Sequence, residues 1–206
     1  MGNRTLRRVN GVGGVTETYT YPSGSNRLSS ISDGTNTRSF SYSAAGNVAN
    51  DNKPGGPNLT LAYNDNNRLA SVTSGSTALA TYTYDALEHR VIKQVSGSGA
   101  YTHHFQYDQD GHLIAESDAT GAVIREYIWL GGLPIGLVDS GNLYFIHADW
   151  RGAPQKATDG SGTIVWDAQI APFGEVYDQR NRGPMATSTM AMISCVRGAN
   201  AAKHPD

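Results

Sequence analysis

Tyrosine recurs at a nearly constant interval along the first half of this 206-residue chain. The spacings between successive copies are 21, 21, 21 and 23 residues. A fixed period of roughly 20–50 residues is typical of repeat proteins, in which each unit is one supersecondary element that stacks on its neighbours. This period constrains the fold more strongly than any other feature of the sequence. The repeated residues are Tyr21, Tyr42, Tyr63, Tyr84 and Tyr107.

The residues after each tyrosine are those of a tight turn. An acidic or amide side chain directly after the tyrosine, such as Asp85 or Asp108, can accept hydrogen bonds from the turn backbone. The fourth residue after the tyrosine is Gly46, Asn67 or Gly111 in three copies. Glycine and asparagine adopt the left-handed conformation most easily, so we expect that conformation there. A type I turn followed by a left-handed residue is a common closure of a β-hairpin.

A second series of turn residues lies 12 to 14 positions after the tyrosines, for example Asp33-Gly34 and Gly121. The segments between the two series are short, and several alternate apolar with polar residues, which favours strands with one buried face. The chain has 24 Gly and 11 Tyr, and its hydrophobic content is only 38%. These features predict an all-β fold of consecutive antiparallel hairpins in a curved, open and thin sheet.

Composition argues against several functional classes. The net charge is −2 and no basic stripe is present, so we expect no nucleic-acid partner. The single cysteine, Cys195, excludes an internal disulfide framework. No run of about 18 apolar residues is present, and the first residues lack the apolar segment of a secretory signal. We therefore expect neither a membrane span nor a signal peptide in this chain.

The Tyr-Asp-x-x-Gly-x-Leu units resemble the YD repeats of Rhs proteins, most closely at Tyr84–Val91 and Tyr107–Leu113. The segment 127–178 resembles the stretch that leads into the Rhs-associated core. There, a Tyr-x-x-His-x-Asp-x-x-Gly-x-Pro element precedes Thr-Asp-x-x-Gly-x-x-Val-Trp and a Phe-Gly-Glu turn. Together these features cover about residues 1–178. The residues that match the core-like motif are Tyr144, His147, Asp149, Gly152, Pro154, Thr158, Asp159, Gly162, Val165, Trp166, Phe173, Gly174 and Glu175.

The resemblance implies a domain organisation and a role. It divides the chain into YD repeats (1–126), a core-like segment (127–182) and a divergent tail (183–206). In longer members of the family the repeats spiral into a hollow β-cocoon shell around a C-terminal toxin, for use against competing cells or hosts. The resemblance thus implies a non-catalytic shell segment without cofactors, whose partners are the rest of the shell and the toxin. It implies a secreted or cell-surface protein, with a cytoplasmic location left open for this fragment alone.

Both ends depart from the family pattern. Gly2–Thr5 reads as the second half of a turn whose tyrosine is missing, and the tail has no aromatic residue and no YD turn. We expect the tail to be poorly ordered, with at most a short helix over Met185–Val196. A non-functional gene remnant therefore stays open as an alternative. Because unpaired sheet edges promote association, we also expect the chain made alone to associate.

Few residues are candidates for chemistry. His103 and His104 are neighbours on a strand and so point to opposite faces. His147 and Asp149 could form a carboxylate–histidine pair, but Asp149 also begins an Asp-x-x-Gly turn and is better explained as its cap. We therefore expect no catalytic residue and no metal ligand. A carbohydrate- or surface-binding module remains the main rival, with the tyrosines or Trp166 and Phe173 as the stacking surface.

Overall fold

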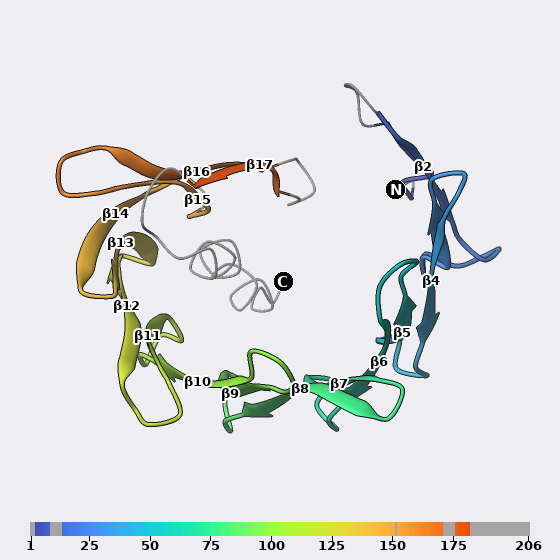
Figure 1. Ribbon diagram of the computed structural model, residues 1–206, viewed down its shortest axis with the longest axis horizontal. Helices are drawn as coiled ribbons and strands as arrows, with labels where there is room; N and C mark the ends of the chain where they lie inside the picture. The colour runs from blue at the N-terminus through green and yellow to red at the C-terminus, as the bar shows by residue number, and fades with distance from the viewer. Residues whose placement is uncertain (1–2, 9–13, 151, 171–175, 182–206) are drawn as a thin grey trace. The chain divides into compact units, whose positions relative to one another are not determined.

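The computed structural model describes residues 3–8, 14–150, 152–170 and 176–181 (Figure 1). These residues form 17 β-strands of three to eight residues and, within those ranges, no helix. The all-β fold of consecutive antiparallel strands expected from the sequence is confirmed. In the described part of the chain there is also no helix that is long and apolar enough to cross a membrane.

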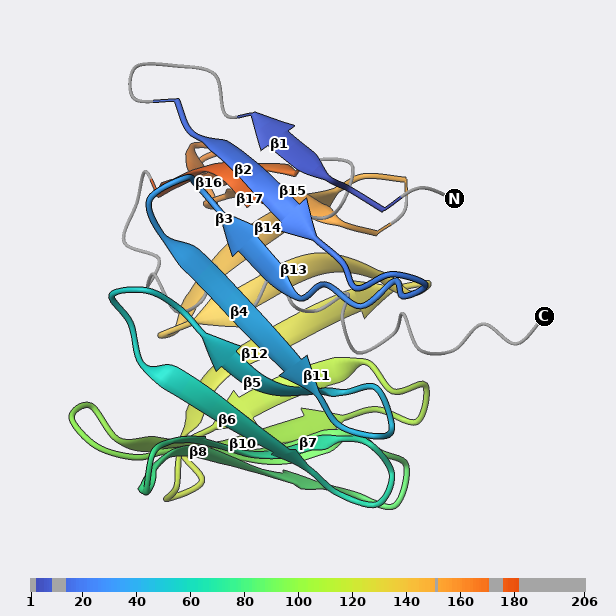
Figure 2. The same ribbon diagram turned by 90° about the vertical axis from the view of Figure 1, so that its right-hand side faces the viewer.

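The chain divides into two compact units, and the first comprises Met1–Thr83 and Lys93–Ala100. Each strand of this unit pairs antiparallel with the next one along the chain (Figure 2). Among its described apolar residues, only Ala80 is buried, as expected for a thin sheet. The strands are β1 (Leu6–Arg8), β2 (Thr16–Thr20), β3 (Ser30–Ser32), β4 (Thr37–Tyr42), β5 (Val48–Asn52), β6 (Asn58–Tyr63), β7 (Leu69–Ser74) and β8 (Thr77–Tyr84).

The second unit comprises Tyr84–Ile92 and Tyr101–Asp206. The boundary therefore runs through β9 (Arg90–Val95). From β10 onward, each strand again pairs antiparallel with the next. The remaining strands are β10 (Tyr101–Tyr107), β11 (Leu113–Ser117), β12 (Val123–Leu130), β13 (Leu133–Asp139), β14 (Asn142–Ala148), β15 (Pro154–Thr158), β16 (Ile164–Ile170) and β17 (Val176–Asn181).

A β-bulge recurs at the same place in the repeat. The strand register shifts directly before Tyr42, Tyr63 and Tyr107. It shifts in the same way before Trp129 and Ala148, in the segment that the sequence assigned to the core-like motif. A bulge bends the strand and increases its local twist. The hairpin repeat therefore continues beyond the last of the five tyrosines.

The second unit contains the larger hydrophobic core. Cross-strand register places Tyr127, Leu137 and Tyr144 in one row. A second row brings together Ile146, Ala157 and Trp166. Both rows are buried in one cluster. They lie on the same face of the sheet because alternate residues of a strand point to the same side. Tyr144, Val165 and Trp166 of the core-like motif thus lie in this core.

Candidate functional site

The repeated tyrosines bind the backbone of the preceding repeat. The hydroxyls of four of the five tyrosines donate a hydrogen bond to a carbonyl oxygen 14 to 17 residues earlier in the chain, just after the preceding turn. This contact holds each repeat in register on its predecessor. The bonds join Tyr21 to Arg4 (3.1 Å), Tyr42 to Leu28 (2.7 Å), Tyr63 to Val48 (3.0 Å) and Tyr107 to Arg90 (3.1 Å).

Trp129 continues this series with a different side chain. Its Nε1–H donates to the carbonyl oxygen of Leu113 at 2.8 Å. We call Tyr21, Tyr42, Tyr63, Tyr107 and Trp129 the aromatic ladder. The sequence analysis followed tyrosine alone and missed Trp129, although it stands 22 residues after Tyr107. Ala148 occupies the next equivalent position after a bulge and has no donor to offer.

Removing one hydroxyl from the ladder tests its energetic role. We expect Tyr63→Phe to lower the free energy of unfolding by about 0.5–1.5 kcal/mol, because it leaves the ring in place and deletes one hydrogen bond. Tyr42→Phe should have an effect of the same size, because its bond is equivalent. Urea denaturation followed by circular dichroism measures both. Two variants as stable as the unaltered chain would show that these bonds add nothing.

Acidic and amide side chains cap the turns, as expected for Asp85 and Asp108. The carboxylate at the start of the turn accepts backbone N–H groups two and four residues later. In the same way, Asp149 accepts the N–H of Ala153, so this residue is a turn cap in the structure. The two-fold caps include Asn64 with Asn66 and Arg68, Asp85 with Leu87 and His89, Asp108 with Asp110 and His112, Asp118 with Thr120 and Ala122, and Asp159 with Ser161 and Thr163, at 2.8 to 3.1 Å.

These bonds stabilise the ionised carboxylates. The hydroxyl of Ser161, followed by the N–H of Thr163, holds the pKa of Asp159 below its usual value. Burial opposes the same change at Asp85 and Asp108, but their hydrogen bonds outweigh it and the pKa of each is lowered. The caps are thus charged at neutral pH.

The left-handed conformation predicted after the tyrosines is observed, with φ of 90° at Gly46, 60° at Asn67 and 82° at Gly111. Glu88 also adopts it, at 67°, although a side chain of this kind favours it little. Glycine has a second advantage here. A Cβ atom on Gly111 would lie 3.0 Å from Nε2 of His89, in the preceding turn. Successive turns therefore pack closely on one another.

A pair of glycine substitutions separates backbone strain from this packing. Gly121 has a similar φ of 88° but no atom within 4 Å of an added Cβ. We expect Gly121→Ala to cost about 1–2 kcal/mol from strain alone. Gly111→Ala should cost more, because His89 must also move. Denaturant unfolding of both variants measures the difference, and equal losses would contradict close turn packing.

A side chain at the end of each of three turns packs on the ring of the next aromatic residue in the ladder. The ring of His89 stacks on Tyr107 and that of His112 on Trp129, both at 4.7 Å between centroids. In the first unit, the guanidinium of Arg27 lies 5.8 Å from the ring centre of Tyr42. We call His89, His112 and the aromatic rings beneath them the turn stack of the second unit.

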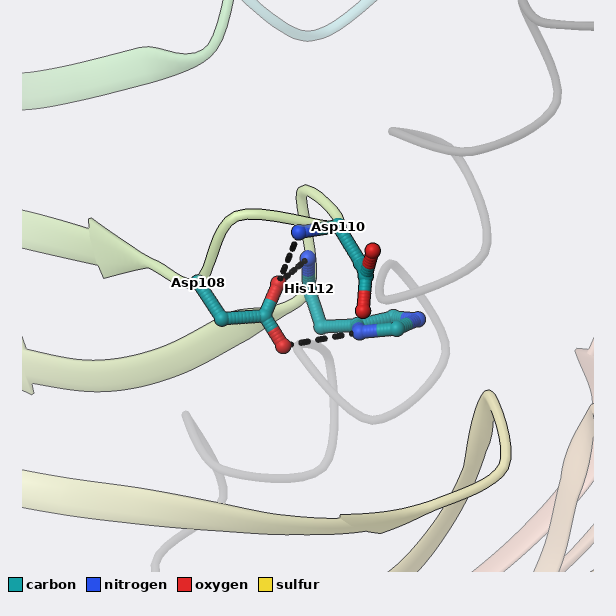
Figure 3. Close-up of side chains that lie close together, drawn as sticks. All are labelled: Asp108, Asp110 and His112. Atoms are coloured by element: carbon teal, nitrogen blue, oxygen red, sulfur yellow. Dashed lines mark hydrogen bonds and ion pairs between the residues drawn. The ribbon is translucent and has the colours of Figure 1, made fainter.

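Asp108, Asp110 and His112 come together at one turn of this stack (Figure 3). Each residue offers one atom that could bind a metal ion, and these three atoms lie within 4.8 Å of one another. Both oxygens of Asp108 are engaged, one by the turn backbone and the other by Nδ1 of His112 at 2.9 Å. The turn at Asp85 and His89 repeats this pairing at 3.2 Å. We therefore interpret the group as a capped turn.

A buried polar cluster lies beside the turn stack in the second unit. Glu116 is 0% exposed, and its carboxylate accepts hydrogen bonds from the hydroxyl of Tyr127 at 2.5 Å and from Nη1 of Arg125 at 3.3 Å. Nδ1 of His103 lies 3.7 Å from the same carboxylate. Burial, together with this negative charge, raises the pKa of Tyr127 far above its usual value. The sequence analysis missed the cluster because nothing in the local pattern marks these residues as buried.

The two residues considered for catalysis, His147 and Asp149, each make a structural contact. Nε2 of His147 contacts the hydroxyl of Thr158 at 3.0 Å, whereas Asp149 caps its own turn. Trp166 is 0% exposed, so it presents no face for a sugar to stack on.

The other motif residues occupy structural positions. Tyr84 ends β8 directly before the Asp85 cap, Pro154 and Thr158 bound β15, and Gly152 and Gly162 have φ of 78° and 83° in turns. Several earlier expectations fall outside the described residues. They concern Phe173, Gly174, Glu175, Cys195 and the tail 183–206.

Comparison with known proteins relates this architecture to a protein family. Two family profiles match the chain, RHS Repeat over residues 63–101 and RHS protein over residues 143–180. The chain is an RHS-repeat protein. The first profile covers three hairpin strands around the Asp85 turn, and the second covers β14 to most of β17. Both therefore fall on the repeated hairpins described above.

Curated relatives of this RHS-repeat protein are much longer. It is 29% identical over 170 residues to the tRNA3(Ser)-specific nuclease WapA of Bacillus spizizenii, covering 76% of this chain and 7% of the relative. It is 23% identical over 210 residues to double-stranded DNA deaminase toxin A of Burkholderia cenocepacia, covering 73% and 15%. Among solved structures, TcdB2-TccC3 matches with 20% identity and a TM-score of 0.49, covering 82% of this chain and 10% of that one.

Proposed function

We propose that this RHS-repeat protein is a non-catalytic segment of a shell that encloses a toxin and helps to deliver it. The aromatic ladder is the observation that carries the proposal. The hydrogen bonds of the ladder, the turn caps and the left-handed glycines all stabilise the hairpins and their contacts with neighbouring hairpins. The most regular side chains of the sequence thus hold the sheet together, which fits a structural role.

The names of the relatives support the proposal that the enclosed cargo is a toxin. Two of them are named as a nuclease and a deaminase toxin, yet this chain matches only 7% and 15% of their lengths. Under the proposal, the toxic activity resides in other parts of such proteins, and the partners of this segment are the flanking shell and the toxin. A shell of this kind acts outside the cell that makes it.

A hybrid protein tests this function. The matching segment of the Bacillus spizizenii nuclease is replaced by residues 1–181 of this chain, and cleavage of the C-terminal part by a protease is followed. We expect protection equal to that of the natural protein. A matched hybrid that carries Trp166→Ala should lose protection, because Trp166 lies in the core of the second unit. Loss of protection in the first hybrid, or full protection in the second, would contradict a shell role.

Surface recognition is a second candidate because Trp150 is 89% exposed. Exposed aromatic rings at a turn can stack on sugars or insert into a partner. If this is the role, binding to a glycan array is lost in Trp150→Ala and kept in Trp166→Phe. A chain that binds no glycan leaves the shell as the only proposal.

A further inference from the structure

We propose that the turn between β10 and β11 binds one divalent transition-metal ion through Asp108, Asp110 and His112. A ring nitrogen of His112 and one carboxylate oxygen from each aspartate lie within 4.8 Å of one another. Figure 3 shows the carboxylate of Asp110 turned toward the imidazole ring. This site differs from the expectation drawn from the sequence, which was that the chain has no metal ligand. It is also independent of the shell function proposed above.

The separation of two of these atoms matches the coordination sphere of such an ion. Nδ1 of His112 lies 2.9 Å from Oδ2 of Asp108. Neighbouring ligand atoms of an octahedral ion, each about 2.1 Å from the metal, are roughly 3.0 Å apart. An ion can therefore replace the hydrogen bond between these atoms with little movement of either side chain. Because a carboxylate only accepts, Nδ1 carries the proton of that bond, and this proton moves to Nε2 when the ion binds.

The turn keeps its own hydrogen bonds when the ion binds. Oδ1 of Asp108 accepts the backbone N–H groups of Asp110 and His112, and Oδ2 is the oxygen that faces the imidazole. The carboxylate of Asp110 is exposed and forms no hydrogen bond or ion pair with the described residues. It can therefore turn to the ion without breaking a contact within them. Solvent completes the coordination sphere on the exposed side of the turn.

The preceding turn shows that the hairpin does not need a carboxylate at the position of Asp110. There, Asp85 accepts the N–H groups of Leu87 and His89, and its Oδ2 lies 3.2 Å from Nδ1 of His89. Leu87 holds the position of Asp110, and its side chain is 69% exposed. The same turn thus forms with two ligand side chains in one repeat and with three in the next. The third carboxylate adds negative charge beside Asp108, which favours a bound cation.

The ligand atoms determine the class of ion. An imidazole nitrogen suits Zn²⁺, Ni²⁺ and Cu²⁺, whereas Ca²⁺ and Mg²⁺ prefer oxygen ligands. Structural zinc sites have four protein ligands, whereas this turn supplies three and leaves positions open to solvent. We therefore expect reversible binding of an ion from solution, with Zn²⁺ or Ni²⁺ bound in preference to Ca²⁺.

Titration of the metal-free full chain with Ni²⁺ tests the site. The ring of His112 stacks on Trp129 at 4.7 Å between centroids, so an ion on Nδ1 is close enough to quench the emission of this tryptophan. We expect saturable quenching that EDTA reverses, and one bound ion per chain by isothermal titration calorimetry. Asp110→Leu should weaken the affinity at least tenfold, because it removes one ligand and leaves the backbone N–H that Asp108 caps.

The reciprocal substitution provides a gain of binding. Leu87→Asp places a third ligand beside Asp85 and His89 and should raise the stoichiometry from one ion per chain to two. In that variant, His112→Gln should return the stoichiometry to one and abolish the quenching. The proposal is overturned if the unaltered chain shows no saturable binding or if Asp110→Leu keeps its affinity, because the ion then binds elsewhere. A stoichiometry of one in Leu87→Asp would also overturn it.

Discussion

Glu116→Ala is expected to lower the free energy of unfolding by about 3–5 kcal/mol. The carboxylate is 0% exposed and contacts the buried Arg125 and the hydroxyl of Tyr127. Its removal leaves a guanidinium and a hydroxyl in a buried site without the oxygens that face them. Neither group can recover its hydration there, which is why loss of one partner costs more than the ion pair itself contributes.

Glu126→Ala is the matched control, because Glu126 is a glutamate on β12, the strand that pairs with the strand of Glu116, but its side chain is exposed. We expect a change within about 0.5 kcal/mol. Guanidinium denaturation at pH 7, followed by circular dichroism, measures both variants. Equal effects would show that the Glu116 cluster is no more important than a surface charge. Glu116→Gln should fall between them, because it keeps the shape and one acceptor oxygen.

Trp166→Ala is expected to cost about 3–5 kcal/mol, for a different reason. The side chain is 0% exposed and packs in the cluster that contains Leu137, Tyr144 and Ala157. Truncation removes a large apolar surface and leaves a cavity that a sheet of short strands can close only in part. Thermal and denaturant unfolding should both show the loss.

Trp166→Phe controls for the indole nitrogen. Nε1 of Trp166 is buried without a hydrogen-bond partner among the described residues, so its removal deletes no bond within them. We expect a cost below about 1.5 kcal/mol. If alanine and phenylalanine prove equally tolerated, the core of the second unit does not depend on this residue.

The turns were predictable from the sequence because their chemistry is local. An Asp followed three residues later by Gly determines its own cap and its own left-handed residue, and Asp108 with Gly111 shows both in the structure. The antiparallel order of the strands followed from the tyrosine period for the same reason. Each hairpin contacts its neighbours in sequence, so little long-range information was needed.

The buried cluster was not predictable because it depends on register across strands. Glu116 and Arg125 become direct partners only when β11 and β12 pair, and a shift of one residue would turn both to the other face. In sequence, each looks like an ordinary charged residue in an alternating strand. Trp129 was missed because an indole N–H can replace a phenol O–H as the donor, while the search followed one residue type.

Hydrogen exchange of backbone amides in Tyr63→Phe tests the central claim, that each ladder aromatic holds its hairpin on the preceding one. The hydroxyl of Tyr63 binds the carbonyl oxygen of Val48, so both ends of the bond lie in the first unit. The account predicts faster exchange in peptides from β5 and β6 and no change in peptides from β13 to β16. Unchanged exchange in β5 and β6, or an equal increase throughout the chain, would contradict it.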